Sequence, residues 1–263
     1  MTNKIKKFYL KKTKNKKLVC LTAYSKNIAK ILDKYCDLVL VGDSMANVLY
    51  GMKNTHRLSL KNIIEHGISV RLGIKKSLLV IDMPKNTYRN ASEAKKNAKL
   101  IFKKTKCDAV KIESNNKNFS IIKKLVDSRI PVMGHIGYTP QFKSKFKIEG
   151  KNKSEEKKLI KEAKLIEKAG AFSIVLECVS PNVAKKITKI IKIPTIGIGS
   201  SSYCDGQILV TDDILGLSGF YPKFIKRYVN LNTIIEKAVK QYSKEIIKNL
   251  FPKKKNFLYG KRN

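Results

Sequence analysis

Four short apolar segments of this chain each end in a carboxylate, and this pattern restricts the possible folds more than any other feature. Continuous runs of Val, Ile and Leu of this length are typical of strands that are buried on both faces, as in a parallel sheet. Burying a carboxylate at the end of such a strand is costly unless a cation or a proton compensates it. The chain holds only 20 Asp and Glu in 263 residues, so four acids at equivalent places indicate one shared site. These acids are Asp43, Asp82, Glu113 and Glu177.

The chain as a whole alternates between predicted strands and predicted helices. Apolar segments predict strands over 18–24, 38–42, 77–81, 109–112, 131–137, 172–176, 194–199 and 206–210. Apolar spacing and capping residues predict helices over 25–35, 58–72, 91–104, 118–127 and 231–250, and two more that begin at Ser154 and Pro181. Ser92 and Glu93 are expected to open the helix over 91–104. Ser154 is expected to cap its helix, and Gly170 to adopt the left-handed conformation beyond the C terminus of that helix.

Eight strands alternating with helices in a chain of this length predict an α/β protein with a (β/α)₈ barrel of the TIM type. A doubly wound open sheet is the alternative. The barrel is favoured because it would bring the ends of the four acid-bearing strands to one mouth, whereas an open sheet would place them in a line. No linker divides the chain. We therefore expect a single barrel domain over 1–250, with a basic N-terminal stretch, and a basic tail over 251–263.

The net charge of +36 has two interpretations. It could serve a phosphate-rich partner such as nucleic acid or an anionic membrane, or it could reflect a compositional bias towards Lys on solvated surfaces. Bias is favoured because only six of the 56 cations are Arg, the residue that specific phosphate and base recognition prefers. The Lys residues are also spread through every polar stretch. We therefore expect no specific nucleic-acid partner and no membrane partner, although the positive field should attract anionic small substrates.

The five cysteines are scattered and form no C-x-x-C pair, which argues against a disulfide scaffold or a structural zinc site. This usage fits a reducing cytosol. The N-terminal residues lack the apolar segment of a secretory signal, and no apolar run approaches the ~18 residues of a membrane span. A cytoplasmic location is expected.

The strand-end acids suggest a metal site. Because residues i and i+2 of a strand face the same way, Lys111 and Glu113 should project together into the site. Asp43 and Asp82 would add further oxygen ligands, and oxygen ligands without His or thiolate favour Mg²⁺ or Mn²⁺ over zinc. The alternative for each acid taken alone is a strand-end cap or a salt bridge to one of the many Lys residues.

Two further residues are candidates for proton transfer or substrate orientation. Glu177 follows a wholly apolar strand, where loss of hydration would raise its pKa towards neutrality, as suits a general base. The alternative is a buried structural acid paired with a lysine. His135 lies between Gly134 and Ile136, with Gly137 next, in a segment that allows close approach of the backbone. It would either orient a substrate or be a hydrogen-bonded core histidine.

Taken together and in order, many segments resemble the ketopantoate hydroxymethyltransferase family, also called 3-methyl-2-oxobutanoate hydroxymethyltransferase. The resemblance covers roughly residues 18–228, and its specificity comes from the agreement of many motifs in order and spacing. It implies a (β/α)₈ barrel similar to the phosphoenolpyruvate/pyruvate barrels. The segments that carry it are Leu21–Tyr24, Leu40–Ser44, Asp82–Pro84, Val110–Glu113, Pro131–Gly137, Thr139–Gln141, Ala169–Phe172, Leu176–Cys178, Ile193–Gly199, Cys204–Val210 and Pro222–Phe224.

The resemblance implies a reaction of pantothenate and coenzyme A biosynthesis. In it a hydroxymethyl group passes from 5,10-methylenetetrahydrofolate to 3-methyl-2-oxobutanoate, with Mg²⁺, to give 2-dehydropantoate. It also implies roles for particular residues: Glu177 as proton acceptor, Asp43, Ser44, Asp82 and Lys111 in binding the oxo acid, and Asp43, Asp82 and Glu113 at the metal, Glu113 directly or through a water. Family members form decamers, so the resemblance implies a homo-oligomer.

The chain departs from the family pattern at three places. Ser25 stands where the family usually has Asp, Ser114-Asn115 replaces Gly-Gly, and Gly199-Ser200-Ser201 replaces a glycine-alanine-glycine stretch. The last two bear on the loops that would admit the folate.

Two other functions are kept as alternatives. One is a related 2-oxo-acid carbon–carbon lyase or transferase on the same barrel. The other is a basic nucleic-acid-binding protein, which would bind RNA or DNA with a steep dependence on salt. The absence of Arg clusters and of interleaved aromatic residues from the sequence argues against it.

Overall fold

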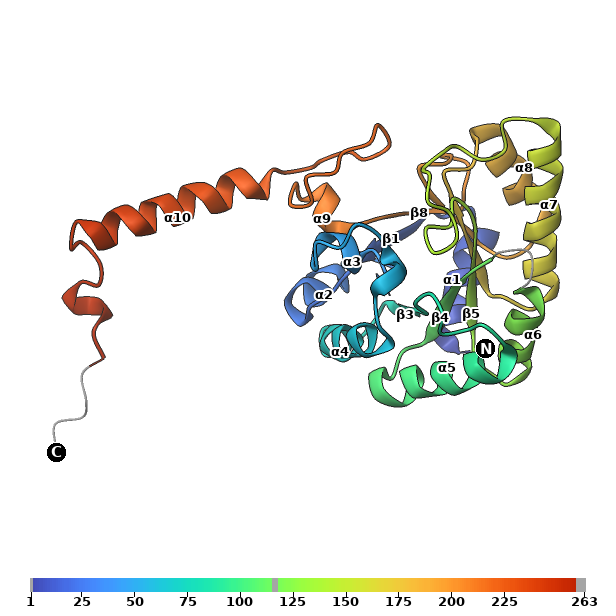
Figure 1. The fold of residues 1–263 in the computed structure, drawn as a ribbon, viewed down its shortest axis with the longest axis horizontal. Coiled ribbons are helices and arrows are strands. Elements are labelled where there is room, and N and C mark those ends of the chain that lie inside the picture. The colour runs from blue at the N-terminus through green and yellow to red at the C-terminus, as the bar shows by residue number, and fades with distance from the viewer. Residues whose placement is uncertain (1, 115–117, 259–263) are drawn as a thin grey trace. The chain divides into compact units, whose positions relative to one another are not determined.

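In the computed structural model, which describes residues 2–114 and 118–258, eight parallel strands close into a barrel in chain order (Figure 1). Each strand pairs with the next, and the last pairs back to the first. The predicted (β/α)₈ barrel is therefore confirmed, and the open sheet is excluded. The strands are β1 (Leu18–Thr22), β2 (Leu38–Val41), β3 (Leu78–Asp82), β4 (Ala109–Glu113), β5 (Val132–Gly137), β6 (Ser173–Glu177), β7 (Thr195–Ile198) and β8 (Gly206–Leu209).

Helices connect the strands and surround the barrel (Figure 1). The α-helices are α1 (Asn3–Thr13), α2 (Lys26–Leu32), α3 (Met45–Val48), α4 (Leu60–Arg71), α5 (Ala91–Thr105), α6 (Phe119–Asp127), α7 (Lys153–Lys168), α8 (Pro181–Ile190), α9 (Thr211–Ile214) and α10 (Leu231–Ile247). Two 3₁₀ turns, η1 (Thr55–Arg57) and η2 (Lys254–Asn256), complete the described elements.

The predicted helices are present, but the N-terminal cap of α7 was assigned to the wrong residue. Asn152, not Ser154, caps α7, because its side chain accepts a hydrogen bond from the N–H of Glu155 at 2.9 Å while its own backbone is extended. Asn is as good an N-cap as Ser, and the two residues lie only two positions apart. Ser92 and Glu93 lie in the first turn of α5, as expected, and Asn90 caps that helix. Gly170 has the expected positive φ, +90°.

The strands separate two hydrophobic cores. Side chains that alternate along the strands fill the barrel interior, among them Leu38, Leu40, Leu78, Val80 and Met133. The intervening side chains pack outward against the helices and form the larger core. Because successive side chains of a strand point to opposite faces, each strand contributes to both cores. The same alternation decides which polar side chains of the strands point into the barrel.

The basic N-terminal stretch forms α1, a helix that was not predicted. Its residues Ile5 and Phe8 are buried among the interior side chains of the barrel, and the rings of Phe8 and Phe172 lie 6.0 Å apart, edge to face. The Lys-rich composition concealed this short apolar stripe, which buries only two residues. α1 therefore closes the barrel at the N-terminal ends of the strands.

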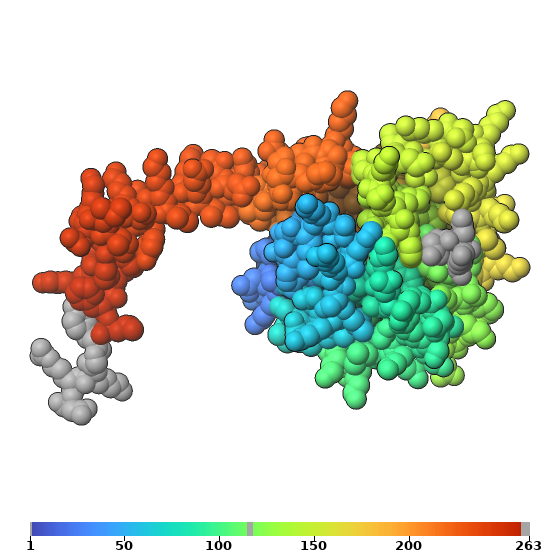
Figure 2. Space-filling view, in the orientation of Figure 1, coloured from blue at the N-terminus to red at the C-terminus, as the bar shows by residue number. Residues whose placement is uncertain are grey.

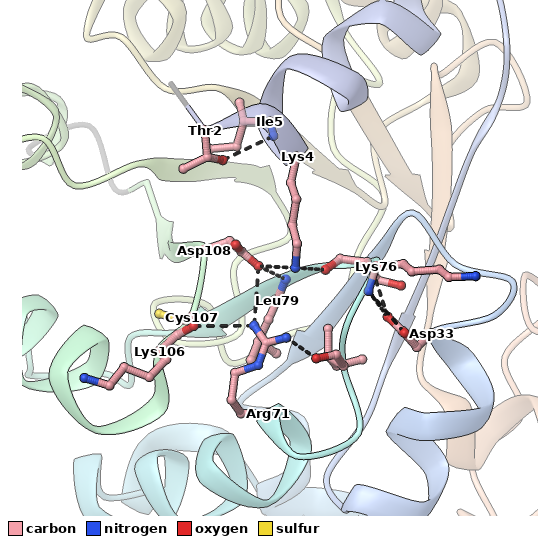
Figure 3. Close-up of polar contacts among 12 residues, drawn as sticks. Thr2, Lys4, Ile5, Asp33, Arg71, Lys76, Leu79, Lys106, Cys107 and Asp108 are labelled. Atoms are coloured by element: carbon pink, nitrogen blue, oxygen red, sulfur yellow. Dashed lines mark hydrogen bonds and ion pairs between the residues drawn. The ribbon is translucent and has the colours of Figure 1, made fainter.

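Polar contacts fix α1 to this end of the barrel (Figure 3). The Nζ of Lys4 donates to the carbonyl of Ser77 at 2.8 Å and lies 3.3 Å from Oδ2 of Asp108. The same Oδ2 accepts the N–H of Leu79 at 2.9 Å and lies 3.8 Å from Nη1 of Arg71. Since this end is closed, an active site is expected at the opposite, C-terminal end of the strands, as in other barrels of this kind.

By its internal contacts the chain divides into two units, Met1–Thr211 and Asp212–Asn263. The second unit, coloured orange to red in Figure 2, contains α10 and η2. The barrel domain over 1–250 and the basic tail over 251–263 stay predictions. None of the residues of α10 is buried, so its apolar spacing predicted the helix without indicating what it packs against.

All five cysteines are unbridged and buried, which agrees with the prediction that the chain is not a disulfide scaffold. None of the helices in the described part of the chain combines the length and the apolar character needed to span a bilayer.

Candidate active site

Strand alternation brings five ionisable side chains into the barrel at its C-terminal end. Asp82 ends β3, Lys111 and Glu113 lie on β4, His135 lies on β5 and Glu177 ends β6. Each lies two or four positions beyond an apolar residue of its own strand that fills the barrel interior. The structure therefore brings together the strand-end acids that the sequence singled out.

Lys111 pairs with Asp82 inside this end of the barrel. The distance between Nζ and Oδ1 is 2.7 Å, and both side chains are almost fully buried. The other oxygen of Asp82, Oδ2, accepts the backbone N–H of Asp43 at 3.1 Å. Burial raises the pKa of Asp82 to about 7, with Asp43 adding to the rise and Lys111 opposing it. The pKa of Lys111 lies above its usual value, because Asp82, Asp43 and Glu113 outweigh the effect of burial.

Glu113 is fully buried, and one of its oxygens lacks a hydrogen-bond donor. Oε2 accepts the backbone N–H of Gln141 at 2.9 Å. Oε1 has no donor within the described residues, and Nδ1 of His135 lies 3.6 Å from it. Burial, and next the charge of Asp43, raise the pKa of Glu113 well above its usual value. A carboxylate held in this way requires a proton or a cation.

Gln141 joins two of the acids, and the sequence analysis assigned it no role. Its Nε2 donates to Oδ2 of Asp43 at 2.9 Å and to the carbonyl of Met83 at 3.1 Å, while its backbone binds Glu113. The side chain is completely buried. Gln141 begins the polar loop after β5, and nothing in the spacing of the sequence indicated that this loop folds back over β2 and β4.

Glu177 and His135 face each other at the ends of neighbouring strands. Oε2 of Glu177 lies 3.2 Å from Nε2 of His135. Burial raises the pKa of Glu177 to about 8, with Lys111 opposing the rise and Asp43 adding to it. This agrees with the direction expected from its apolar strand. Burial and the charge of Lys111 lower the pKa of His135 well below its usual value, so the imidazole is neutral.

Gly137, at the end of β5, is a position that requires glycine. Its φ is +95°, and a Cβ there would collide with the backbone carbonyl of Glu177. Nζ of Lys143 donates to the carbonyl of Gly137 at 2.7 Å. The close approach of β5 and β6 at this point sets the separation between His135 and Glu177.

The serines singled out from the sequence have different surroundings. The hydroxyl of Ser44, which precedes α3, shares a hydrogen bond of 2.8 Å with that of Tyr24. Ser114 is buried, and its Oγ has no hydrogen-bond partner among the described residues. Ser200 donates to the carbonyl of Val179 at 2.9 Å. Ser25 precedes α2 without a capping hydrogen bond from its side chain in the described part of the chain. Asn115 lies outside the described residues.

The charges and donor atoms at this end of the barrel fit a hard divalent cation. Four carboxylates face one lysine and a neutral histidine, and Oε1 of Glu113 is an acceptor without a donor in the described chain. Within residues 2–114 and 118–258, no three or more His, Cys, Asp or Glu side chains are grouped so as to hold an ion together. Asp43 and Asp82 are in contact, and Glu113 has the oxygen without a donor, so these are the carboxylates that could hold such an ion. The three-residue metal site stays a prediction.

A cavity of about 750 Å³ lies beside these residues. Ser114 and Gly137, which follow or end β4 and β5, line it on the side of the acids, and Phe142 contributes an aromatic ring. Lysines and glutamates of the loop after β5 and of α7 line most of the rest, together with Thr139, Ser144 and Leu159: Lys143, Lys145, Lys147, Glu149, Glu155, Lys158 and Glu162. The cavity borders the candidate site through Ser114, the residue after Glu113, and through Gly137.

Comparison with known proteins matches almost the whole chain. Residues 2–254 match the family model described as ketopantoate hydroxymethyltransferase. The 3-methyl-2-oxobutanoate hydroxymethyltransferase of Pelagibacter ubique is 54% identical over 256 residues, covering 97% of this chain and 99% of that protein. The protein of the same name from Anaplasma marginale (strain St. Maries) is 45% identical over 239 residues, with coverage of 90% and 86%.

Solved structures support the fold. 2,3-Dimethylmalate lyase, a member of the PEP mutase/isocitrate lyase superfamily, superimposes with a TM-score of 0.63 at 11% identity, over 98% of this chain and 92% of that one. This likeness shows the fold alone, and it agrees with the expected similarity to the phosphoenolpyruvate/pyruvate barrels.

Proposed function

This chain belongs to the ketopantoate hydroxymethyltransferase family, and we propose that it transfers a hydroxymethyl group from 5,10-methylenetetrahydrofolate to 3-methyl-2-oxobutanoate. The product would be 2-dehydropantoate, a precursor of pantothenate and coenzyme A. One observation supports the proposed chemistry. Glu177, a carboxylate with a raised pKa, lies at the same end of the barrel as a buried, charged lysine and three further acids.

The 2-oxo acid would bind at Lys111 with its charged and polar oxygens. Lys111 is cationic and buried, so it attracts the substrate carboxylate or oxo oxygen strongly in a medium of low polarity. Ser44 supplies a hydroxyl beside Asp43, at the position that the family resemblance assigns to oxo-acid binding. When bound by Asp43, Asp82 and Glu113, Mg²⁺ would polarise the oxo group as a Lewis acid.

Glu177 would act as the general base. It takes the proton from C3 of the oxo acid, and the C–H electrons move into the C2–C3 bond as the oxo oxygen gains negative charge. Lys111 stabilises that oxygen because its charge is in place before the proton moves. One C–N bond of the folate's methylene bridge breaks to give an iminium, water adds to its carbon, and the second C–N bond breaks to leave tetrahydrofolate and formaldehyde. C3 then forms a bond to the formaldehyde carbon, and the formaldehyde oxygen takes up a proton to become the hydroxyl of the hydroxymethyl group. The cavity lined by Ser114, Gly137 and Phe142 is the space that we assign to the folate.

The remaining assignments follow from the same proposal. Both substrates are anions, which suits a chain with a net charge of +36. We propose a cytoplasmic enzyme without a nucleic-acid or membrane partner. We also propose a homo-oligomer, because α10 exposes large apolar side chains, among them Ile234, Val239 and Tyr242.

A turnover assay tests the proposed function. Incubation with 3-methyl-2-oxobutanoate, 5,10-methylenetetrahydrofolate and Mg²⁺ is expected to yield 2-dehydropantoate, and excess chelator is expected to stop the reaction until Mg²⁺ is restored. A panel of other 2-oxo acids serves as the specificity control. If the enzyme turned over another oxo acid in preference to 3-methyl-2-oxobutanoate, the proposed substrate would be wrong. If activity were undiminished in excess chelator, the proposed role of Mg²⁺ would be wrong.

The rate of proton abstraction should rise with pH. Only the ionised form of Glu177 accepts a proton, so with a pKa of about 8 the ionised fraction grows about tenfold for each pH unit below that value. Initial rates of deuterium exchange at C3, measured from pH 5.5 to 9, test this. A rate that is flat between pH 6 and 8 would contradict it.

A further inference from the structure

We propose that His135 is a positioning residue, which holds the Glu177 carboxylate by donating its Nε2–H to Oε2 while its Nδ1 accepts a hydrogen bond from Lys111. This rests on the proposed function, in which Glu177 accepts the C3 proton. Glycines flank His135 in the sequence, which left a substrate-orienting role and a core role open. The contacts of the two ring nitrogens assign it a third role.

The contact with Lys111 decides which ring nitrogen carries the proton. Nζ of Lys111 lies 3.4 Å from Nδ1 of His135. An ammonium group has three donors and no acceptor, so it can bond only to a nitrogen with a lone pair. Oε1 of Glu113 lies farther from the same Nδ1, at 3.6 Å. We therefore infer from the shorter contact with Lys111 that Nδ1 is unprotonated and that the proton of the ring is on Nε2.

The proton on Nε2 faces the proposed base. Nε2 has no aligned acceptor within the described residues, but Oε2 of Glu177 lies 3.2 Å away, within hydrogen-bond distance. Catalytic hydrogen bonds are often poorly aligned without substrate and tighten when it binds. Holding Oε2 would fix the carboxylate so that Oε1 is the atom that takes the proton.

The barrel places these three residues in this order. β5 lies between β4 and β6, so His135 lies between Lys111 and Glu177. The His135 side chain is 3% exposed, and water does not compete for either nitrogen. Lys111, the cation that would bind the oxo acid, and Glu177, the proposed base, therefore contact opposite nitrogens of the His135 ring. The ring keeps the tautomer that orients Glu177 only while Lys111 is charged.

Two substitutions separate the ring nitrogens. In His135→Asn the amide lies near the place of Nδ1, so the contact with Lys111 can persist while the donor to Glu177 is lost. In His135→Gln the amide N–H reaches the place of Nε2, so that donor is kept. We expect His135→Asn to lower kcat for deuterium exchange at C3 by about 10–100-fold, as for other outer-shell partners. His135→Gln should retain several-fold more activity, and KM for the oxo acid should change little in both.

The outcomes are distinguishable. Equal losses in the two variants, or a larger loss in His135→Gln, would overturn the positioning role. Glu177→Gln is measured alongside, because full exchange in that variant would instead overturn Glu177 as the base and with it the proposed function.

A measurement on the unmodified protein covers the case in which the variants fold poorly. The chain has only three histidines, so ¹⁵N solid-state NMR of the histidine-labelled protein can resolve the His135 ring, once the signals of His56 and His66 are identified by replacing each of these residues in turn. A proton on Nε2 and a bare Nδ1 are expected. A proton on Nδ1, or on both nitrogens, would overturn the assignment.

Discussion

Replacing Glu177 by Gln is expected to lower the rate of deuterium exchange at C3 of 3-methyl-2-oxobutanoate by about 10²–10⁴-fold, the range typical of general acid–base catalysis. Gln has nearly the same shape, but its amide cannot accept the proton. Exchange in D₂O with Mg²⁺ and without folate isolates this step from the later bond formation. The substrate is followed by NMR through the loss of its C3 proton signal.

The binding of the oxo acid should survive this substitution. Glu177 is not among the residues that we assign to the substrate oxygens or to the metal, so the affinity for both should change little. Glu65→Gln, the same chemical change on the exposed outer face of α4, is the matched control and should exchange at the unmodified rate. Exchange by Glu177→Gln within a few-fold of the control would show that another group takes the proton.

Replacing Lys111 by Met is expected to have the largest effect on stability. The buried ion pair with Asp82 would be broken, and removing one partner of such a pair typically costs about 3–5 kcal/mol because the other charge stays buried. Asp43 and Glu113 would also lose the cation that offsets their charges. Catalysis should fall as well, by about 10²–10³-fold, as when a donor to a developing oxyanion is removed.

The loss of stability should depend on pH, with a sign that the buried acids set. Lys111 lowers the pKa of Asp82 and Glu113, so both values rise further in Lys111→Met. An acid whose pKa is higher in the folded than in the unfolded state stabilises the fold when protonated, and this contribution is lost as the pH rises. Urea unfolding should therefore show a larger difference from the unmodified protein at pH 8 than at pH 5.5.

The matched control is Lys123→Met on α6. Lys123 makes an exposed ion pair with Asp127, and such pairs contribute little to stability. Unfolding of this variant should follow the unmodified protein at both pH values. If Lys111→Met were no less stable than Lys123→Met at pH 8, the acids would be compensated by something other than Lys111.

Much of the barrel could be predicted from the sequence because its strands are continuous apolar runs. A strand buried on both faces has to be apolar throughout, so β2, β3, β4 and β6 stand out against the Lys-rich helices and loops. Helix α1 could not be predicted in this way, since only Ile5 and Phe8 of its residues are buried. The N-terminal cap of α7 was misplaced because Asn152 and Ser154, two residues apart, are equally good caps.

The sequence by itself determined which polar residues end up at the mouth of the barrel. Asp82, Glu113 and Glu177 are the last residues of apolar strands, and the period of two along a strand fixes the face on which each lies. Local geometry of this kind depends on neighbours in the chain, and it is therefore written into the order of residues.

Only the tertiary structure decided how these residues are paired. Lys111 lies two residues from Glu113 in the sequence, yet it pairs with Asp82 on the neighbouring strand β3. Gln141, in the polar loop after β5, hydrogen-bonds both Asp43 and Glu113. His135 links Lys111 to Glu177 because β5 lies between their strands. These contacts depend on the closure of the barrel, which sets the spacing of residues from different strands. No spacing within one segment of the sequence contains that information.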